Sequence, residues 1–257
     1  MTQESRQPKA VILVAGDGGR LRGDRGLPKA LLQVLGRTLL ERTLETLVEL
    51  GVCRFVVVTG YGDDRVRRFI RTSGLDRRYI LEIVHNGRWR EGTARSVWTA
   101  REAAGDRFLV VMGDHLFDPN ALAGFLRVDG DFVGAFDSRA TYVDLAEATK
   151  AQGLDGKIER IGKDLETFEY VDAGLFLCSE EILPAIERCL SRDEDSWNDV
   201  KREWIQTRDL HIYDLRGGFW LDIDTPQDLE RARHLLRQIS AGAILGAPGI
   251  GAPVPGA

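Results

Sequence analysis

Three glycines and two basic side chains near the start of the chain have the types and spacing needed to bind phosphate. Residues 11–15 are apolar, and the glycines lie within residues 16–19, immediately before Arg20. Lys29 follows after a proline. Glycine lets a backbone approach a ligand and offer its N–H groups to phosphate oxygens, while arginine and lysine add cationic donors. The segment has neither the Walker A spacing nor the dinucleotide fingerprint, in which a helix opens directly after the glycines.

Three aspartates form a second group with chemical potential. Asp114 follows an apolar run, and Asp222 and Asp224 lie two residues apart in a later segment, where an extended backbone would point both the same way. Carboxylates suit Mg²⁺, a hard ion that prefers oxygen ligands. Taken singly, Asp114 is equally well explained as a turn residue and Asp224 as an acid at a helix N-terminus. Together they predict a magnesium site, with Asp114 and Asp222 ranked above Asp224. We assign His115 to packing or hydrogen bonding.

The composition of the 257-residue chain limits the classes of protein that it can be. Its 43% hydrophobic content and formal net charge of −5 are typical of a soluble globular protein. The acidic balance argues against nucleic acid as a partner. No apolar run reaches the roughly 20 residues of a membrane-spanning helix, and the N-terminus lacks the apolar core of a signal peptide. The three widely spaced cysteines argue against a disulfide framework or a zinc site, so we expect a cytoplasmic location.

Apolar runs and amphipathic segments alternate along the chain, which predicts a mostly parallel sheet with helices on its faces. Strands are expected at residues 11–15, 54–59, 79–85, 108–112, 132–136 and 173–178. Helices are expected at residues 38–50, 63–72, 93–104, 119–127, 180–190 and 226–238, with Thr93 and Thr225 as N-caps. Because ligands of such sheets bind outside the carboxyl ends of the strands, the glycine segment and Asp114 should lie at the same edge.

The alternation of strands and helices loosens after residue 137. Residues 147–152 and 156–161 are expected to form two strands joined by a tight turn that contains Asp155 and Gly156. Residues 209–214 are expected to form an edge or hairpin strand. These segments predict a small antiparallel extension beside the main sheet.

The motifs taken together resemble those of the sugar-phosphate nucleotidyltransferase superfamily. The signature loop of that superfamily is similar to residues 15–21 followed by Pro28 and Lys29. Within the superfamily, the chain resembles most the inositol-1-phosphate cytidylyltransferases, which form CDP-inositol. The segments that carry this closer resemblance are residues 86–96, 113–115, 160–163, 170–176 and 220–226. The resemblance extends from about residue 9 to residue 238.

The resemblance implies a Mg²⁺-dependent enzyme that condenses CTP with a phosphorylated alcohol and releases pyrophosphate. The alcohol that fits the resemblance best is inositol 1-phosphate, and its phosphate would attack CTP directly and in line. Arg20 and Lys29 would be catalytic, and Asp114, Asp222 and Asp224 would bind the metal. The residues implied in nucleotide binding are Ala15, Gly16, Gly18, Gly92 and Thr93. Lys163 and Gly174 would bind the second substrate, although Lys163 is equally well explained as a solvated loop lysine.

The resemblance also implies a single Rossmann-like, mostly parallel central sheet with helices on both faces and a small antiparallel extension on the substrate side. Residues 1–240 would form this catalytic domain. Residues 241–257 hold only Ala, Gly, Pro, Ile, Leu and Val, which favours a flexible tail or linker. Some members of the inositol group continue into a membrane-embedded CDP-alcohol phosphotransferase, so the chain is expected to be linked to such a domain or to act with one.

Several alternatives remain open at the level of sequence. One is a nucleotidyltransferase that acts on another sugar 1-phosphate or on phosphocholine. A second is a non-catalytic domain of the same fold that senses nucleotides, against which Arg20, Lys29, Asp114 and Asp222 argue. A third is a glycosyltransferase with an Asp-x-Asp metal motif, but the central strand here leads into Gly-Asp-His instead. The nucleobase, the alcohol and the oligomeric state are left open.

Overall fold

A computed structural model describes residues 7–21 and 26–240 of the chain. The side chains of Arg20 and Ser240 are outside that description. The tail or linker expected at residues 241–257 also lies outside the described residues.

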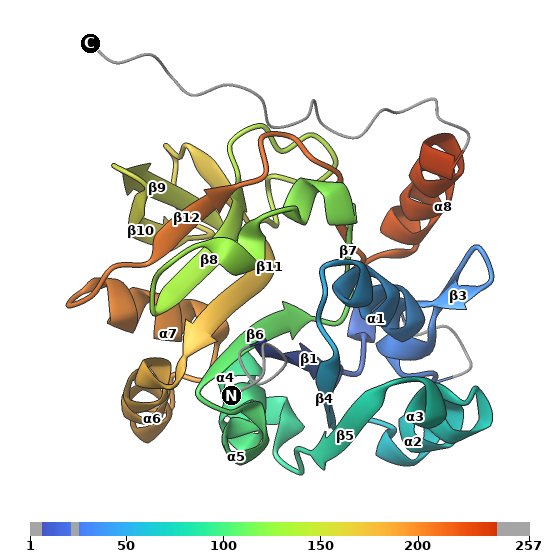
Figure 1. The fold of residues 1–257 in the computed structure, drawn as a ribbon. Coiled ribbons are helices and arrows are strands. Elements are labelled where there is room, and N and C mark those ends of the chain that lie inside the picture. The colour runs from blue at the N-terminus through green and yellow to red at the C-terminus, as the bar shows by residue number, and fades with distance from the viewer. Residues whose placement is uncertain (1–6, 22–25, 241–257) are drawn as a thin grey trace.

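A nine-stranded sheet forms the centre of the molecule, in the order β5-β4-β1-β6-β11-β8-β12-β10-β9 (Figure 1). Its strands are β1 (Lys9–Leu13), β4 (Arg54–Thr59), β5 (Ile80–His85), β6 (Arg107–Met112), β8 (Phe132–Asp137), β9 (Lys150–Leu154), β10 (Lys157–Gly162), β11 (Tyr170–Ser179) and β12 (His211–Asp214). The strands from β5 to β6 run parallel, and β12 runs parallel to β8. β11 is antiparallel to both of its main neighbours, and β10 is antiparallel to β12 and β9. The Rossmann-like, mostly parallel sheet with an antiparallel extension is therefore confirmed.

Helices cover both faces of this sheet because successive side chains of its strands point to opposite sides. The helices are α1 (Leu39–Glu49), α2 (Asp63–Thr72), α3 (Leu75–Arg78), α4 (Thr93–Thr99), α5 (Arg101–Ala104), α6 (Leu183–Ser191), α7 (Trp197–Ile205) and α8 (Pro226–Ser240). In β1, Ala10 and Ile12 pack with the apolar residues of α1 to α3. Val11 and Leu13 pack with those of α4 to α7. The sheet thus separates two apolar cores.

A third, smaller core lies at the carboxyl edge of the sheet. It joins α8 to a two-stranded sheet made of β7 (His115–Phe117) and β13 (Trp220–Asp222). A hairpin of β2 (Gln33–Val34) and β3 (Arg37–Thr38) lies beside it. The β7–β13 pairing fixes the last strand of the chain against the end of β6, far away in the sequence.

Capping interactions account for the positions at which two of the helices begin. Thr38 and Glu41 form a reciprocal capping box at the start of α1. Thr225 acts in the same way before α8, because its hydroxyl accepts from the backbone N–H of Asp228 and donates to the carboxylate of that residue. The expected cap at Thr225 is confirmed. Thr93 is not a cap, because α4 begins at it and its hydroxyl instead accepts the backbone N–H of Trp197.

Two further expectations about the elements were wrong, and one helix was missed. Residues 119–127 form two short 3₁₀ turns instead of one helix, because Gly124 between them has a left-handed φ of 101°. β12 lies inside the sheet, between β8 and β10, and is not an edge strand. The helix α7 was not expected, although a capping box between Ser196 and Asp199 opens it.

Candidate active site

The ends of two central strands approach each other closely at the carboxyl edge of the sheet. β1 ends at Leu13 and β6 at Met112, and the N–H of Gly113 donates to the carbonyl of Leu13 over 3.0 Å. A Cβ on Gly113 would lie 2.7 Å from that carbonyl oxygen and 2.5 Å from Val14. Glycine is therefore required here, and it allows Asp114 to emerge directly above the end of β1.

Lys29 reaches this edge from the loop that follows β1. A 3₁₀ turn (Lys29–Leu31) carries it, and Gly18, with a φ of 64°, packs against its side chain so closely that a Cβ would lie 2.9 Å from the Cβ of Lys29. The buried ammonium lies 2.6 Å from Asp114 Oδ2 and 2.5 Å from Asp224 Oδ1. Asp222 Oδ1 lies further away, at 3.9 Å. One lysine thus lies among all three aspartates of the expected metal group.

His115 completes this group, which we call the carboxylate cluster (Lys29, Asp114, His115, Asp222 and Asp224). Register in the β7–β13 pair puts His115 opposite Asp222. Its Nδ1 lies 2.8 Å from Asp114 Oδ1 and 3.7 Å from Asp222 Oδ1. Ligand atoms of Asp114, His115 and Asp222 all lie within 4.8 Å of one another, a spacing that a metal ion could bridge. The sequence reasoning had left His115 out of the metal group.

The surroundings of Asp114 and Asp222 shift the pKa values of these two carboxyl groups in opposite directions. Burial favours the neutral form of Asp114, but the ammonium of Lys29 and the imidazole of His115 outweigh it and hold the pKa of Asp114 well below its usual range. Burial raises the pKa of Asp222 to about 6, and the neighbouring carboxylates act in the same direction. Burial opposes the charge on His115, yet Asp222 and Asp114 raise its pKa to about 9. Burial lowers the pKa of Lys29, but the charges of the three aspartates outweigh this effect and raise the pKa above its usual range.

At neutral pH the cluster therefore carries more negative than positive charge. Three carboxylates face the ammonium of Lys29 and the imidazolium of His115, whose Nδ1–H donates to Asp114. Asp222 Oδ1 is buried and has no hydrogen-bond partner among the described residues. A buried anionic oxygen without a donor is the type of atom that a cation would satisfy.

A cavity of about 820 Å³ opens beside the cluster. Asp222 and Asp224 line one part of its wall, and residues of β11, α7 and the loop after β10 line another. Of the residues expected from the sequence, Thr93, Lys163, Gly174, Asp222 and Asp224 line this cavity. Lys29 and Asp114 adjoin it through the carboxylate cluster. A cavity of this volume is large enough to hold a small molecule beside the carboxylate cluster.

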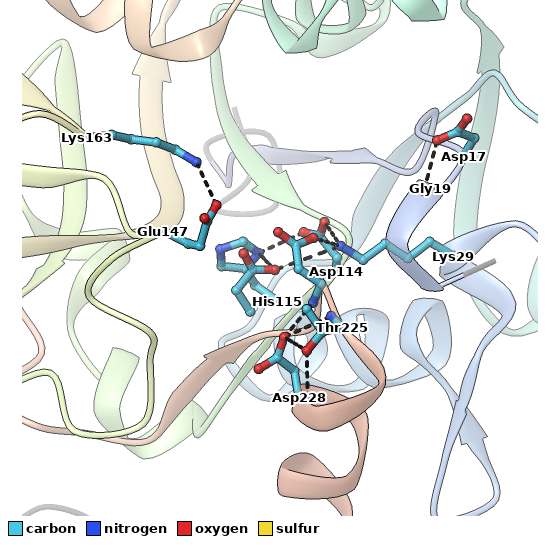
Figure 2. Close-up of polar contacts among 11 residues, drawn as sticks. Asp17, Gly19, Lys29, Asp114, His115, Glu147, Lys163, Thr225 and Asp228 are labelled. Carbon is cyan, nitrogen blue, oxygen red and sulfur yellow. Dashed lines mark hydrogen bonds and ion pairs between the residues drawn. The ribbon is translucent and has the colours of Figure 1, made fainter. Parts of the chain in front are cut away.

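The loop expected to bind nucleotide lies on another side of the cluster. Figure 2 shows Asp17 and Gly19 apart from the cluster on one side, and Lys163 and Glu147 apart from it on the opposite side. Ala15 is buried, and its carbonyl accepts the N–H of Tyr61. No described atom outside the immediate neighbours would lie within 4 Å of a Cβ on Gly16. Arg20 cannot be placed, because its side chain lies outside the description.

Gly92 and Thr93 lie where α4 meets the loop before α7. Gly92 has a φ of 89°, and a Cβ there would lie 2.5 Å from the carbonyl oxygen of Asp195. The hydroxyl of Thr93 accepts the N–H of Trp197 over 2.8 Å. Both residues therefore hold α4 against α7 next to the cavity.

The two residues expected to bind the second substrate differ in environment. Lys163 is 57% exposed and lies 4.0 Å from a carboxylate oxygen of Glu147, apart from the cluster (Figure 2). Gly174 has a φ of 74°, and a Cβ there would lie 2.7 Å from Nε2 of His115. Gly174 thus gives His115 the room to lie beside Asp114.

Sequence reasoning missed a buried pair in the cavity wall, Lys201 of α7 and Asp172 of β11. Their side chains are only 2% and 6% exposed and form a charged hydrogen bond. A signal was present in the sequence. Lys201 lies on the same helical face as Trp197, Val200 and Trp204, where the 3.6-residue period predicts an apolar side chain.

Comparisons with known proteins agree with this geometry. Residues 10–203 match the family described as the MobA-like NTP transferase domain. A protein of Rubrobacter xylanophilus named "bifunctional IPC transferase and DIPP synthase" is 39% identical over 229 residues, covering 88% of this chain and 51% of that protein. Its namesake in Archaeoglobus fulgidus is 32% identical over 228 residues, covering 89% of this chain and 44% of that protein. This chain thus spans about half the length of these relatives.

The solved structures give the same fold. A structure described as the inositol-1-phosphate CTP transferase from T. maritima has a TM-score of 0.82 at 25% identity, covering 92% of this chain and 97% of that one. A UDP-glucose pyrophosphorylase shares the fold at 15% identity with a TM-score of 0.76. Among the residues that the structure describes, no helix has both the length and the apolar character to cross a membrane.

Proposed function

This chain belongs to the MobA-like NTP transferase family, and on that premise we propose that it condenses CTP with inositol 1-phosphate to CDP-inositol and pyrophosphate. The names of its relatives and of the T. maritima structure support this choice of substrates. The observation that carries the proposal is the position of Lys29, a buried cation among three aspartates at the carboxyl edge of the sheet, beside a cavity of about 820 Å³.

The proposed reaction is a single in-line displacement. A phosphate oxygen of inositol 1-phosphate attacks the α-phosphorus of CTP and forms a new P–O bond. The P–O bond to the β-phosphate breaks, and pyrophosphate leaves. Because the attacking oxygen is already anionic, the reaction needs no general base, and catalysis rests on orientation and on stabilisation of negative charge.

Lys29 and Arg20 are the proposed catalytic cations. Lys29 is buried and forms ion pairs with three carboxylates, which would fix the position of its charge before the substrates arrive. In the proposal it faces the phosphate groups that develop charge during the transfer. Arg20 is included on the resemblance of its motif alone.

Mg²⁺ is the proposed cofactor, and the residues present fit it. The orphaned oxygen of Asp222 and the excess of carboxylates supply the hard oxygen ligands that this ion prefers. Asp114, Asp222 and Asp224 would hold the ion, and His115 would orient Asp114 through its hydrogen bond. When bound, Mg²⁺ would neutralise phosphate charge. A triphosphate would otherwise be repelled by a cluster of net negative charge.

The remaining roles follow the resemblance. We propose that backbone around Ala15, Gly16 and Gly18, together with Gly92 and with Thr93 in the cavity wall, binds the nucleotide. Lys163 and Gly174 are proposed to border the second substrate in the cavity, which both of them line.

We also propose a cytoplasmic location and a partner at the membrane. The buried thiols of Cys178 and Cys189 are free, as is typical of a reducing compartment. The resemblance implies a membrane-embedded CDP-alcohol phosphotransferase as the partner, and the relatives named as bifunctional are about twice as long as the segment that this chain matches. We propose that this chain is linked to such a domain or acts together with one.

A product analysis tests the proposal. The protein is incubated with Mg²⁺ and each of the common nucleoside triphosphates, against inositol 1-phosphate, glucose 1-phosphate and phosphocholine, and the products are identified by mass. CDP-inositol and pyrophosphate are expected in equal amounts from CTP and inositol 1-phosphate. A product with another base or alcohol would favour the alternative of a different nucleotidyltransferase. Nucleotide binding without any product would favour the sensing domain.

A further inference from the structure

The buried pair of Lys201 and Asp172 has unused hydrogen-bonding capacity toward the cavity. The ammonium of Lys201 carries three N–H groups. Among the described residues it makes one hydrogen bond, to Asp172 Oδ2, and lies over the ring of Phe176, with Nζ 5.0 Å from the ring centroid. Asp172 accepts the N–H of Gly174 with its other oxygen, over 2.8 Å. Lys201, Asp172 and Phe176 all line the cavity.

The pair is connected to the carboxylate cluster through Gly174. Asp172 fixes the backbone at Gly174, and that backbone lies against the ring of His115 so closely that a Cβ would lie 2.7 Å from Nε2. A molecule bound at the pair therefore lies in the same cavity as Asp222 and Asp224. This is the position that the non-reacting part of a second substrate would take.

The stability of the fold does not explain why an ion pair is buried at this position. Removing two charges from water costs free energy, and apolar replacements for a buried ion pair are often neutral or stabilising. Most other side chains of α7 on this face are apolar, including Val200 and Trp204. A ligand in the cavity would give this pair a function, because it could form hydrogen bonds with the N–H groups and lone pairs that the two side chains do not use for each other.

We propose that Asp172 and Lys201 determine specificity for the second substrate by binding adjacent hydroxyl groups of a neutral polyol. This inference rests on the proposed function and names the part of the alcohol that the site recognises. One hydroxyl donates to Asp172, and its neighbour accepts from Lys201. Without the ammonium, Asp172 would be an unmatched carboxylate, which would favour alcohols that carry a positive charge, such as phosphocholine.

The charge balance of the pair selects hydroxyl groups over phosphate. A phosphate dianion is attracted by a cation in excess, whereas the charge of Lys201 is matched by that of Asp172. A matched pair instead offers a donor and an acceptor side by side. A hydroxyl both donates and accepts, so neighbouring hydroxyls complement such a pair.

The test compares three phosphate esters as second substrates with CTP and Mg²⁺. They are inositol 1-phosphate, cyclohexyl phosphate, which has the ring without free hydroxyls, and phosphocholine. The variants are Lys201→Met and Asp172→Asn, and the double variant K201M/D172L, which leaves no uncompensated charge if a single change impairs folding. The matched controls are Lys157→Met and Asp209→Asn, which alter an exposed ion pair between β10 and the loop before β12.

Lys201→Met is expected to lower kcat/KM for inositol 1-phosphate roughly ten- to hundredfold, the range of one charged hydrogen bond. Its kcat/KM for cyclohexyl phosphate and its KM for CTP should stay unchanged, and its discrimination against phosphocholine should fall. Equal losses on inositol 1-phosphate and cyclohexyl phosphate would overturn the inference, since a purely structural role affects both. Wild-type-like values in both Lys201→Met and the double variant would also overturn it.

Failure of the proposed function can be told apart from failure of this inference. If the wild type forms no product with any ester, calorimetry with inositol 1-phosphate and phosphocholine replaces the kinetic measurement. Tighter binding of inositol 1-phosphate than of phosphocholine, lost in Lys201→Met, would support the inference without the reaction. Binding of inositol 1-phosphate that does not change in Lys201→Met would overturn it.

Discussion

At the carboxyl edge of the sheet, some contacts of single residues could be predicted from the sequence and others could not. The rule that ligands bind at the carboxyl ends of the strands predicted that the glycine segment and Asp114 would lie at the same edge, and Lys29 contacts Asp114 there. The partners of Lys29 were not predictable, because its motif indicates phosphate binding and does not show that three carboxylates surround its ammonium. His115 was also missed, since only the register of β7 against β13 places it opposite Asp222.

Replacement of Lys29 by alanine is expected to reduce turnover more than substrate binding. Loss of one preorganised charge contact lowers kcat roughly 10²- to 10³-fold. Pyrophosphate release at saturating CTP and inositol 1-phosphate measures this, with Lys157→Ala as the control for an exposed lysine. Turnover of Lys29→Ala equal to that of the wild type would remove Lys29 from the catalytic group.

Asp222→Asn is expected to raise the Mg²⁺ concentration that gives half-maximal activity, because it replaces a charged ligand by a neutral amide. Titration of activity with Mg²⁺, after removal of divalent ions with a chelator, provides the measurement. Asp118→Asn serves as the control, since Asp118 caps a 3₁₀ turn and asparagine caps equally well. A Mg²⁺ titration curve identical to that of the wild type would exclude Asp222 as a ligand.

The elements that position the site were predictable where local signals agree with burial. β4 and α2 have the expected bounds because a valine run and an amphipathic charged run mark them clearly. The helix α7 was missed because the polar Lys201 interrupts its apolar face. β12 was taken for an edge strand since its alternating pattern does not reveal that β10 covers it. Such placements depend on contacts between distant parts of the chain.

At the start of α7, Ser196→Ala should destabilise the protein by about 1 kcal/mol through loss of the N-cap. The hydroxyl of Ser196 accepts the N–H of Asp199 over 3.1 Å, and the carboxylate of Asp199 accepts the N–H of Ser196. Urea unfolding measures the change, and Thr38→Ala at the equivalent cap of α1 is the matched comparison. Because α7 carries Lys201, only Ser196→Ala should also weaken the use of inositol 1-phosphate.

On the scale of the whole molecule, one sheet connects the two halves of the site. The glycine loop and Asp114 follow the parallel strands β1 and β6, while β11 and the antiparallel extension contribute to the wall of the cavity. The general architecture was predictable from alternating strands and helices. The order of strands beyond β6 was not, because β11 reverses direction between two strands that run the other way.

A protein that consists of residues 1–240 is therefore expected to keep the activity of the full chain. The buried apolar residues of the described part lie between Ala10 and Leu235, so the cores and the site are complete within that range. Thermal unfolding of the truncated protein should show one transition at the same temperature as the full chain, since its two main cores share the same strands. A lower transition temperature or a reduced kcat/KM would mean that residues 241–257 belong to the folded domain, which would contradict the proposed boundary.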